Sequence, residues 1–159
     1  MSKLFHGLVS EGVLGTWAEL LDWLFDDNRF STENGWTSGY VGAFIKKVKR
    51  IPNLGDHNYQ YGPIKDLNIP QTTPDGLTII HAKGDGESRD LVRHIRNGIA
   101  HGKTELSKPN GELHIKILDF NNQGEQTAYI LMSITQLQLI YKAYAEVKKS
   151  KENARKRGR

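Results

Sequence analysis

The segment from Arg89 to Gly102 constrains the fold more than any other stretch, because its residues repeat with the period of an α-helix. Four apolar residues fall on one side at about 100° per residue; they are Leu91, Val92, Ile95 and Ile99. Three arginines, Arg89, Arg93 and Arg96, fall together on another side. A helix with this pattern buries its apolar stripe and presents a column of guanidinium groups to solvent or to a partner.

Two glycines weaken the helical pattern at the carboxyl end of this segment. Gly98 and Gly102 predict that the helix ends or is distorted there. On an undistorted helix Arg96 and His101 would point roughly 140° apart, so one straight helix could not easily direct both side chains at one atom. Either the backbone unwinds at Gly98, or the two groups converge from neighbouring copies of the chain. Both alternatives place a site at the helix end, and the second implies a dimer.

The run Arg96-Asn97-Gly98-Ile99-Ala100-His101 resembles the Arg-x(4–6)-His signature of the HEPN superfamily. Asn97 is the polar residue that usually follows the arginine of that signature, and Gly102 also fits the common form of the motif. The resemblance covers only a small part of the chain. It implies a mainly α fold, a HEPN-like helical bundle of four to five helices that dimerises along the motif helix.

Arginine and histidine in this arrangement suit cleavage of RNA without a metal ion. The reaction needs a base for the proton of a 2′-hydroxyl group, and a cation for the charge that grows on the phosphoryl oxygens. Histidine, with an ordinary pKa of about 6.5, binds or releases a proton near neutral pH, and arginine binds phosphate oxygens with two donors. We therefore expect His101 to act as general base or acid and Arg96 to stabilise the phosphate. Asn97 would orient the backbone or the histidine.

The resemblance implies a function as well as a fold. Many HEPN proteins are metal-independent endoribonucleases, commonly toxins or anti-phage defence proteins, and the expected products are a 2′,3′-cyclic phosphate and a 5′-hydroxyl. The implied partners are RNA, a second copy of the chain and an antitoxin protein. Toxins that pair with nucleotidyltransferase antitoxins carry a tyrosine two residues after the histidine, where this chain has Lys103. Control by modification of such a tyrosine is therefore not expected.

The residues leave two other functions open. Arg96 and Asn97 could cap and brace the helix end while His101 packs, and the chain would then be a catalytically silent HEPN module that binds RNA or nucleotides. The basic face could instead serve assembly in a protein-interaction domain. If RNA is the partner, the residues expected to contact it are Arg89, Arg93, His94 and Lys103.

Composition excludes several kinds of site. The 159 residues include no cysteine, so disulfide bonds and thiolate metal sites are absent. His94 and His101 lie seven residues apart, but no third histidine or carboxylate stands at ligand spacing, so we expect neither a metal nor a cofactor. No apolar run approaches the length of a membrane span, and a cytoplasmic protein is expected. We expect residues 1–148 to form one HEPN-like domain and residues 149–159 to form a basic, disordered tail.

Apolar spacing also places the remaining elements. It predicts one helix that begins near Leu14 and a second over residues 40–48. The sequence predicts an irregular connection over residues 51–86. A connection of this length is either a functional lid or contains helical turns that the pattern does not reveal. Within this connection the apolar run 77–80 fits a strand or part of a helix equally well. Ser88 is the expected cap of the motif helix.

After the motif the pattern changes to that of strands. Leu113, Ile115 and Ile117 alternate with polar residues, and residues 127–132 are rich in strand formers, so we expect a β-hairpin before the last helix. Ser133 and Gln136 have the spacing of a capping box that opens that helix.

Overall fold

The computed structural model describes residues 3–26, 30–52, 54 and 58–158. The α-helices are α1 (Lys3–Ser10), α2 (Leu14–Asp26), α3 (Ser38–Lys49), α4 (Glu87–Ala100) and α5 (Ile134–Arg157). The strands are β1 (Tyr59–Gly62), β2 (Thr78–Ala82), β3 (Thr104–Ser107), β4 (His114–Phe120) and β5 (Gln126–Ser133). Short 3-10 helices are η1 (Thr32–Asn34), η3 (Ile64–Asp66) and η4 (Pro109–Gly111). None of the helices in these residues has the length and apolar character needed to cross a membrane.

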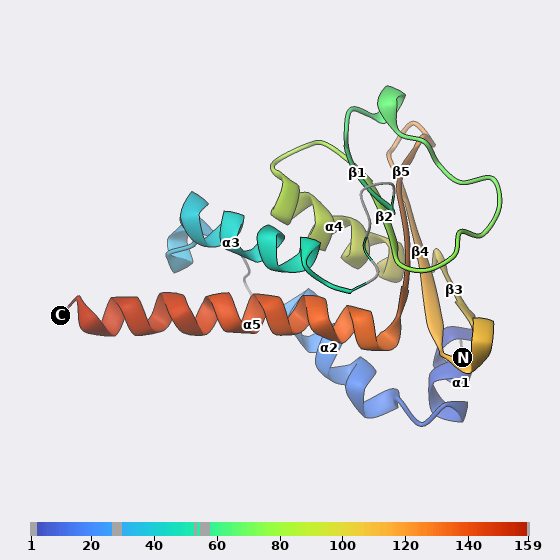
Figure 1. The fold of residues 1–159 in the computed structure, drawn as a ribbon, viewed down its shortest axis with the longest axis horizontal. Helices are drawn as coiled ribbons and strands as arrows, with labels where there is room; N and C mark the ends of the chain where they lie inside the picture. The colour runs from blue at the N-terminus through green and yellow to red at the C-terminus, as the bar shows by residue number, and fades with distance from the viewer. Residues whose placement is uncertain (1–2, 27–29, 53, 55–57, 159) are drawn as a thin grey trace.

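The strands form one five-stranded sheet in the order β1-β2-β5-β4-β3. The outer pair β1 and β2 is parallel, and the other neighbours are antiparallel, with Ile117 of β4 opposite Ile130 of β5. Helices α2, α3, α4 and α5 lie on one side of this sheet, and α1 lies at its β3 end (Figure 1). The sheet corrects the expectation of a helical bundle with a single hairpin: the β4–β5 hairpin is present, but three further strands extend it on both sides.

Alternation along β4 decides which residues face the helices. Ile115, Ile117 and Asp119 are buried, while the residues between them are half-buried on the opposite face. Every residue of β5 after Gln126 is buried, because both faces of the central strand are covered. On the face away from the helices, Leu67 and Ile69 of the β1–β2 connection pack against a small hydrophobic cluster, which consists of Ile80, Tyr129 and Leu131. Residues 63–76 therefore act as a cover for that face.

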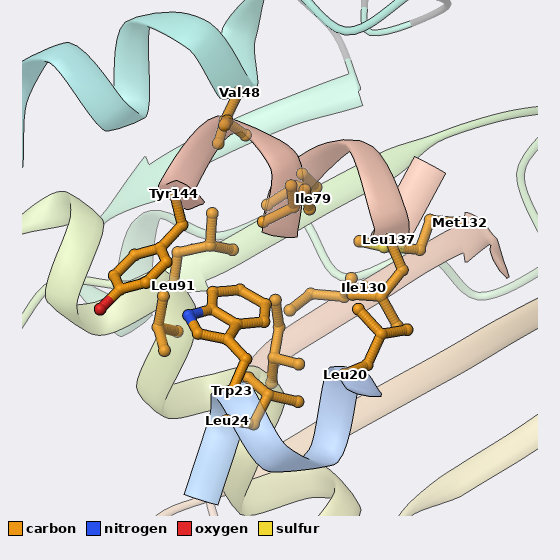
Figure 2. Close-up of a cluster of buried hydrophobic side chains, with 14 of the residues drawn as sticks. Leu20, Trp23, Leu24, Val48, Ile79, Leu91, Ile130, Met132, Leu137 and Tyr144 are labelled. Carbon is orange, nitrogen blue, oxygen red and sulfur yellow. The ribbon is translucent and has the colours of Figure 1, made fainter. Parts of the chain in front are cut away.

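The main core lies between the sheet and the helices (Figure 2). Trp23 of α2 and Tyr144 of α5 meet with ring centroids 5.4 Å apart, and Phe30 and Trp36 add further ring contacts around Tyr144. Aliphatic side chains of α2, α4, α5 and the sheet fill the space beside these rings. This core fixes α4 between the sheet and the remaining helices.

Several expected elements are confirmed. The helix that begins near Leu14 is α2, residues 40–48 lie within α3, and the hairpin of β4 and β5 is formed. The capping box is also formed, since the Ser133 hydroxyl accepts from the Gln136 N–H and the Gln136 side chain accepts from the Ser133 N–H.

Other expectations are corrected. Residues 51–86 contain β1, β2 and η3, so this connection is less irregular than expected. Of the two alternatives left open for residues 77–80, the structure contains the strand, because they lie mainly in β2. Ser88 is not the cap of α4, because it is buried within the helix and its hydroxyl donates to the Val41 carbonyl. The expected disorder of residues 149–159 is wrong for the part described, because α5 continues as a helix to Arg157.

Replacing Ser133 by Ala should lower the free energy of unfolding by about 1 kcal/mol, because it removes the hydroxyl that caps α5. Chemical denaturation measures the change. Ser150→Ala is the matched control, since Ser150 is exposed in the middle of the same helix and should show no comparable loss. Equal stabilities of the Ser133→Ala and Ser150→Ala variants would contradict the role given to the cap.

Candidate functional site

The motif lies on α4, which packs closely on strand β4 at Gly98. A Cβ atom at Gly98 would lie 2.6 Å from the Leu118 carbonyl oxygen and would also overlap the Ile117 side chain. Gly98 is buried and stays within the helix. Glycine therefore serves a close approach of helix and sheet here, and the alternative that the backbone unwinds at Gly98 is not what the structure contains.

The amino end of α4 is held by Asp90. Its carboxylate accepts hydrogen bonds from the backbone N–H groups of Gly84, Asp85 and Gly86, from the Tyr61 hydroxyl and from the Arg93 guanidinium. Burial would raise the pKa of Asp90, but these hydrogen bonds hold it well below its ordinary value. A fixed negative charge at the start of a helix also suits the helix dipole.

The carboxyl end of α4 presents His101. The helix ends at Ala100, the His101 N–H donates to the Asn97 carbonyl, and the Lys103 N–H donates to the Gly98 carbonyl. Gly102 takes the left-handed conformation, with φ of 68°, that lets the chain turn into β3. The His101 side chain is exposed, as the proposed acid–base role requires.

Arg96 and His101 do not share one face of this helix. Because α4 is helical through Ala100, the two side chains leave it roughly 140° apart and about 7.5 Å apart along the axis. Arg96 is half-buried, and no ion pair within the described residues involves it. The guanidinium is therefore available to an anionic ligand.

The expected RNA contacts differ in what they bind. Arg89 donates two hydrogen bonds to the Phe30 carbonyl, at 3.1 and 3.3 Å, and so joins α4 to the segment before α3. Arg93 pairs with Asp90 at 2.9 Å, yet 41% of its side chain is exposed. Lys103 is exposed, with its Nζ 5.9 Å from the centroid of the Phe120 ring. Arg93 and Lys103 therefore remain open to a ligand, whereas Arg89 has a structural contact.

The expectation that His94 contacts RNA is wrong, because only 1% of the surface of this residue is exposed. Its Nδ1 lies 2.7 Å from an Asp119 carboxylate oxygen, and its Nε2 lies 3.1 Å from the Ala82 carbonyl. Both ring nitrogens therefore lie within hydrogen-bonding distance of a buried oxygen atom. His94 is therefore part of a buried polar cluster beneath the motif helix.

Asp119 connects this cluster to the motif. Burial would raise its pKa, but the hydrogen bond and charge of His94 and further hydrogen bonds from the Phe120 N–H and the Asn97 side chain lower it. Asn97 thus reaches the sheet from α4, and it precedes His101 by one helical turn on the same side of the helix. The contact fits the expected orienting role of Asn97.

His81 forms the deeper end of the cluster. Its ring lies 5.8 Å from that of His94, and its Nε2 lies 3.0 Å from the Tyr59 hydroxyl. Its Nδ1 is buried and has no hydrogen-bond partner within the described residues. Burial, followed by the charge of His94, lowers the pKa of His81 to about 3, so this ring is neutral in the folded protein at neutral pH.

Sequence reasoning missed Asp119, His81 and Asp90 as parts of the site. A signal for Asp119 was present, because the alternation of Ile115 and Ile117 continues to position 119 and puts a carboxylate on the buried face of the strand. No comparable signal marks His81, which lies in a strand of ambiguous pattern. The described residues contain no group of three histidine, aspartate or glutamate residues that could hold a metal ion.

Comparison with known proteins gives a match to a protein family. The family model described as HEPN pEK499 p136 matches residues 28–155, which include the motif, the sheet and most of α5. No curated protein and no solved structure matches the chain.

Acid should destabilise the protein through His81. Its pKa is about 3 when folded and about 6.5 when unfolded, so only the unfolded state binds this proton as the pH falls from 6.5. The free energy of unfolding should then drop between pH 6.5 and 5 by up to about 1.4 kcal/mol per pH unit from this group. Chemical denaturation at several pH values measures the slope.

Two substitutions test whether His81 causes this pH dependence of the free energy of unfolding. His81→Phe keeps a ring but removes the titrating group, so the slope should become flatter. Tyr59→Phe removes only the hydroxyl that His81 contacts, and the slope should persist. A His81→Phe variant with the slope of the unmodified protein would contradict the assignment.

Proposed function

The chain belongs to the HEPN pEK499 p136 family, and on that premise we propose that it is a metal-independent endoribonuclease whose site is composed from two copies of the chain. The observation that carries the proposal is the geometry of α4, which stays helical while Arg96 and His101 lie about 140° apart on it. Two motif helices that meet across a two-fold axis would bring the arginine of one copy toward the histidine of the other.

The chemistry follows from the two side chains. A neutral His101 takes the proton of a 2′-hydroxyl group, and the 2′-oxygen attacks the adjacent phosphorus. Arg96 stabilises the negative charge on the phosphoryl oxygens with its two parallel donors. The bond to the 5′-oxygen breaks, and the second histidine of the composite site donates a proton to that leaving oxygen. The products are a 2′,3′-cyclic phosphate and a 5′-hydroxyl.

Neighbouring residues support this arrangement. The Asn97 side chain, whose hydrogen bond lowers the pKa of Asp119, lies in the last turn of α4 and supports an orienting role toward His101. Arg93 and Lys103 supply exposed positive charge on either side of the motif, which suits an RNA backbone. We assign the protein to the toxin or anti-phage-defence type of HEPN ribonuclease, with an antitoxin protein as a candidate partner.

A second function is favoured by the same divergence of Arg96 and His101. If the motif helices do not meet in a dimer, no single chain assembles both groups at one phosphate, and the protein would bind RNA without cleaving it. Binding with a steep salt dependence but without new RNA ends would identify this silent module.

Arg96→Ala and His101→Ala should each lower the rate of RNA cleavage by at least about 10²-fold, because each removes a group that acts on the reacting phosphate. The assay uses total RNA in the presence of EDTA and detects 2′,3′-cyclic phosphate ends.

Arg50→Ala and His114→Ala are the matched controls, since they change the same residue types at the carboxyl-terminal cap of α3 and in β4. They should retain the activity of the unmodified protein. Cleavage that survives both motif substitutions, or that requires a divalent cation, would contradict the proposed mechanism.

A further inference from the structure

The carboxyl-terminal part of α5 contains no buried residue. Val147 is the last buried residue of α5, yet the helix continues to Arg157. Figure 1 shows this end of α5 running past the other helices. Ten residues, or about 15 Å of helix, therefore follow the last buried residue of α5.

Positive charge predominates in this extension. Residues 148–157 contain six lysines and arginines and a single acidic residue, Glu152. Cations in the last turn suit the helix dipole, but that effect falls off within one turn and does not account for the lysines further back. A surface built for solubility alone would mix both signs, whereas a single sign attracts a polyanion.

One lysine fixes how the extension is rotated. Lys151 donates to the Asn34 carbonyl at 2.8 Å, and its Nζ lies 5.3 Å from the centroid of the Trp36 ring. Lys151 therefore continues the inward stripe of Tyr144 and Val147, which differ from it by seven and four residues. The opposite side of α5 must face outward.

Three lysines lie on that outward side. Lys142, Lys149 and Lys156 are seven residues apart, so they fall within about 40° of one another and about 10 Å apart along the helix. All three are exposed, and no ion pair within the described residues involves them. We call these three residues the lysine stripe.

We propose that the lysine stripe is a second RNA-binding surface, which holds the phosphate backbone of a long RNA away from the cleavage site. The stripe spans about 20 Å in a straight line, a length that meets several phosphates of one strand. Its lysines offer charge without planar, bidentate recognition, which suits a backbone contact without base specificity. The choice of RNA as the polyanion rests on the proposed function.

Binding measured without cleavage tests the inference. All proteins carry His101→Ala, so that the RNA stays intact whether or not the proposed nuclease activity exists. Replacing the lysine stripe by Ala should weaken binding of a long single-stranded RNA about tenfold at low salt and reduce the slope of log K against log salt by about 2. Circular dichroism checks that α5 remains helical.

The matched control replaces Lys65, Lys83 and Lys108 by Ala, which removes the same charge from exposed positions outside α5. It should leave affinity and salt slope closer to those of the parent protein. Equal losses in the two triple variants would overturn the proposal. So would a loss of binding to anionic phospholipid vesicles with RNA binding unchanged, because that result assigns the stripe to a membrane surface.

Kinetics separate this surface from the cleavage site if the protein is active. With the native histidine present, the lysine-stripe variant should show a raised KM for long RNA, an unchanged kcat, and unchanged cleavage of a dinucleotide that cannot reach α5. A fall in kcat on the dinucleotide would contradict a separate anchoring role.

Discussion

The close packing of α4 on β4 is the constraint on which the placement of the motif side chains depends. At Gly98 the helix approaches the Leu118 carbonyl so closely that any side chain would overlap it. This contact keeps α4 helical up to His101 and fixes the rotation of the helix relative to the sheet. Arg96 and His101 then leave the helix in divergent directions, which supports the proposal that a site using both draws on a second copy of the chain.

A buried, hydrogen-bonded pair of polar side chains adds specificity to that packing. His94 and Asp119 lie 2.7 Å apart with almost no exposure, and their remaining hydrogen-bonding groups bind the Ala82 carbonyl, the Phe120 N–H and Asn97. Polar groups buried in this way are costly unless they are hydrogen-bonded. The pair therefore favours one placement of α4 over neighbouring ones, and Asn97 transmits that placement to the last turn before His101.

The sequence predicts the motif helix and its surroundings better than the sheet. Helical periodicity identifies α2, α3, α4 and α5, and alternation identifies β4. Strands β1 and β3 have four residues each, too few for a reliable alternation, and they form because β2 and β4 offer edges to pair with. The burial of polar side chains could not be predicted from the sequence. His94 lies outside the apolar stripe of its helix and is therefore expected at the surface, but in the fold it is buried against Asp119. The high charge of residues 149–157 predicts disorder. They form the end of helix α5 instead, and Lys151 donates a hydrogen bond to the Asn34 carbonyl.

Subunit mixing tests the composite site most directly. A small amount of the unmodified chain is refolded with a large excess of chain carrying both Arg96→Ala and His101→Ala, so that nearly every unmodified chain has an inactive partner. If the site draws on two copies, activity per unmodified chain should fall at least about 10²-fold. Activity per unmodified chain that is independent of the excess would show that one chain suffices, and would contradict the account.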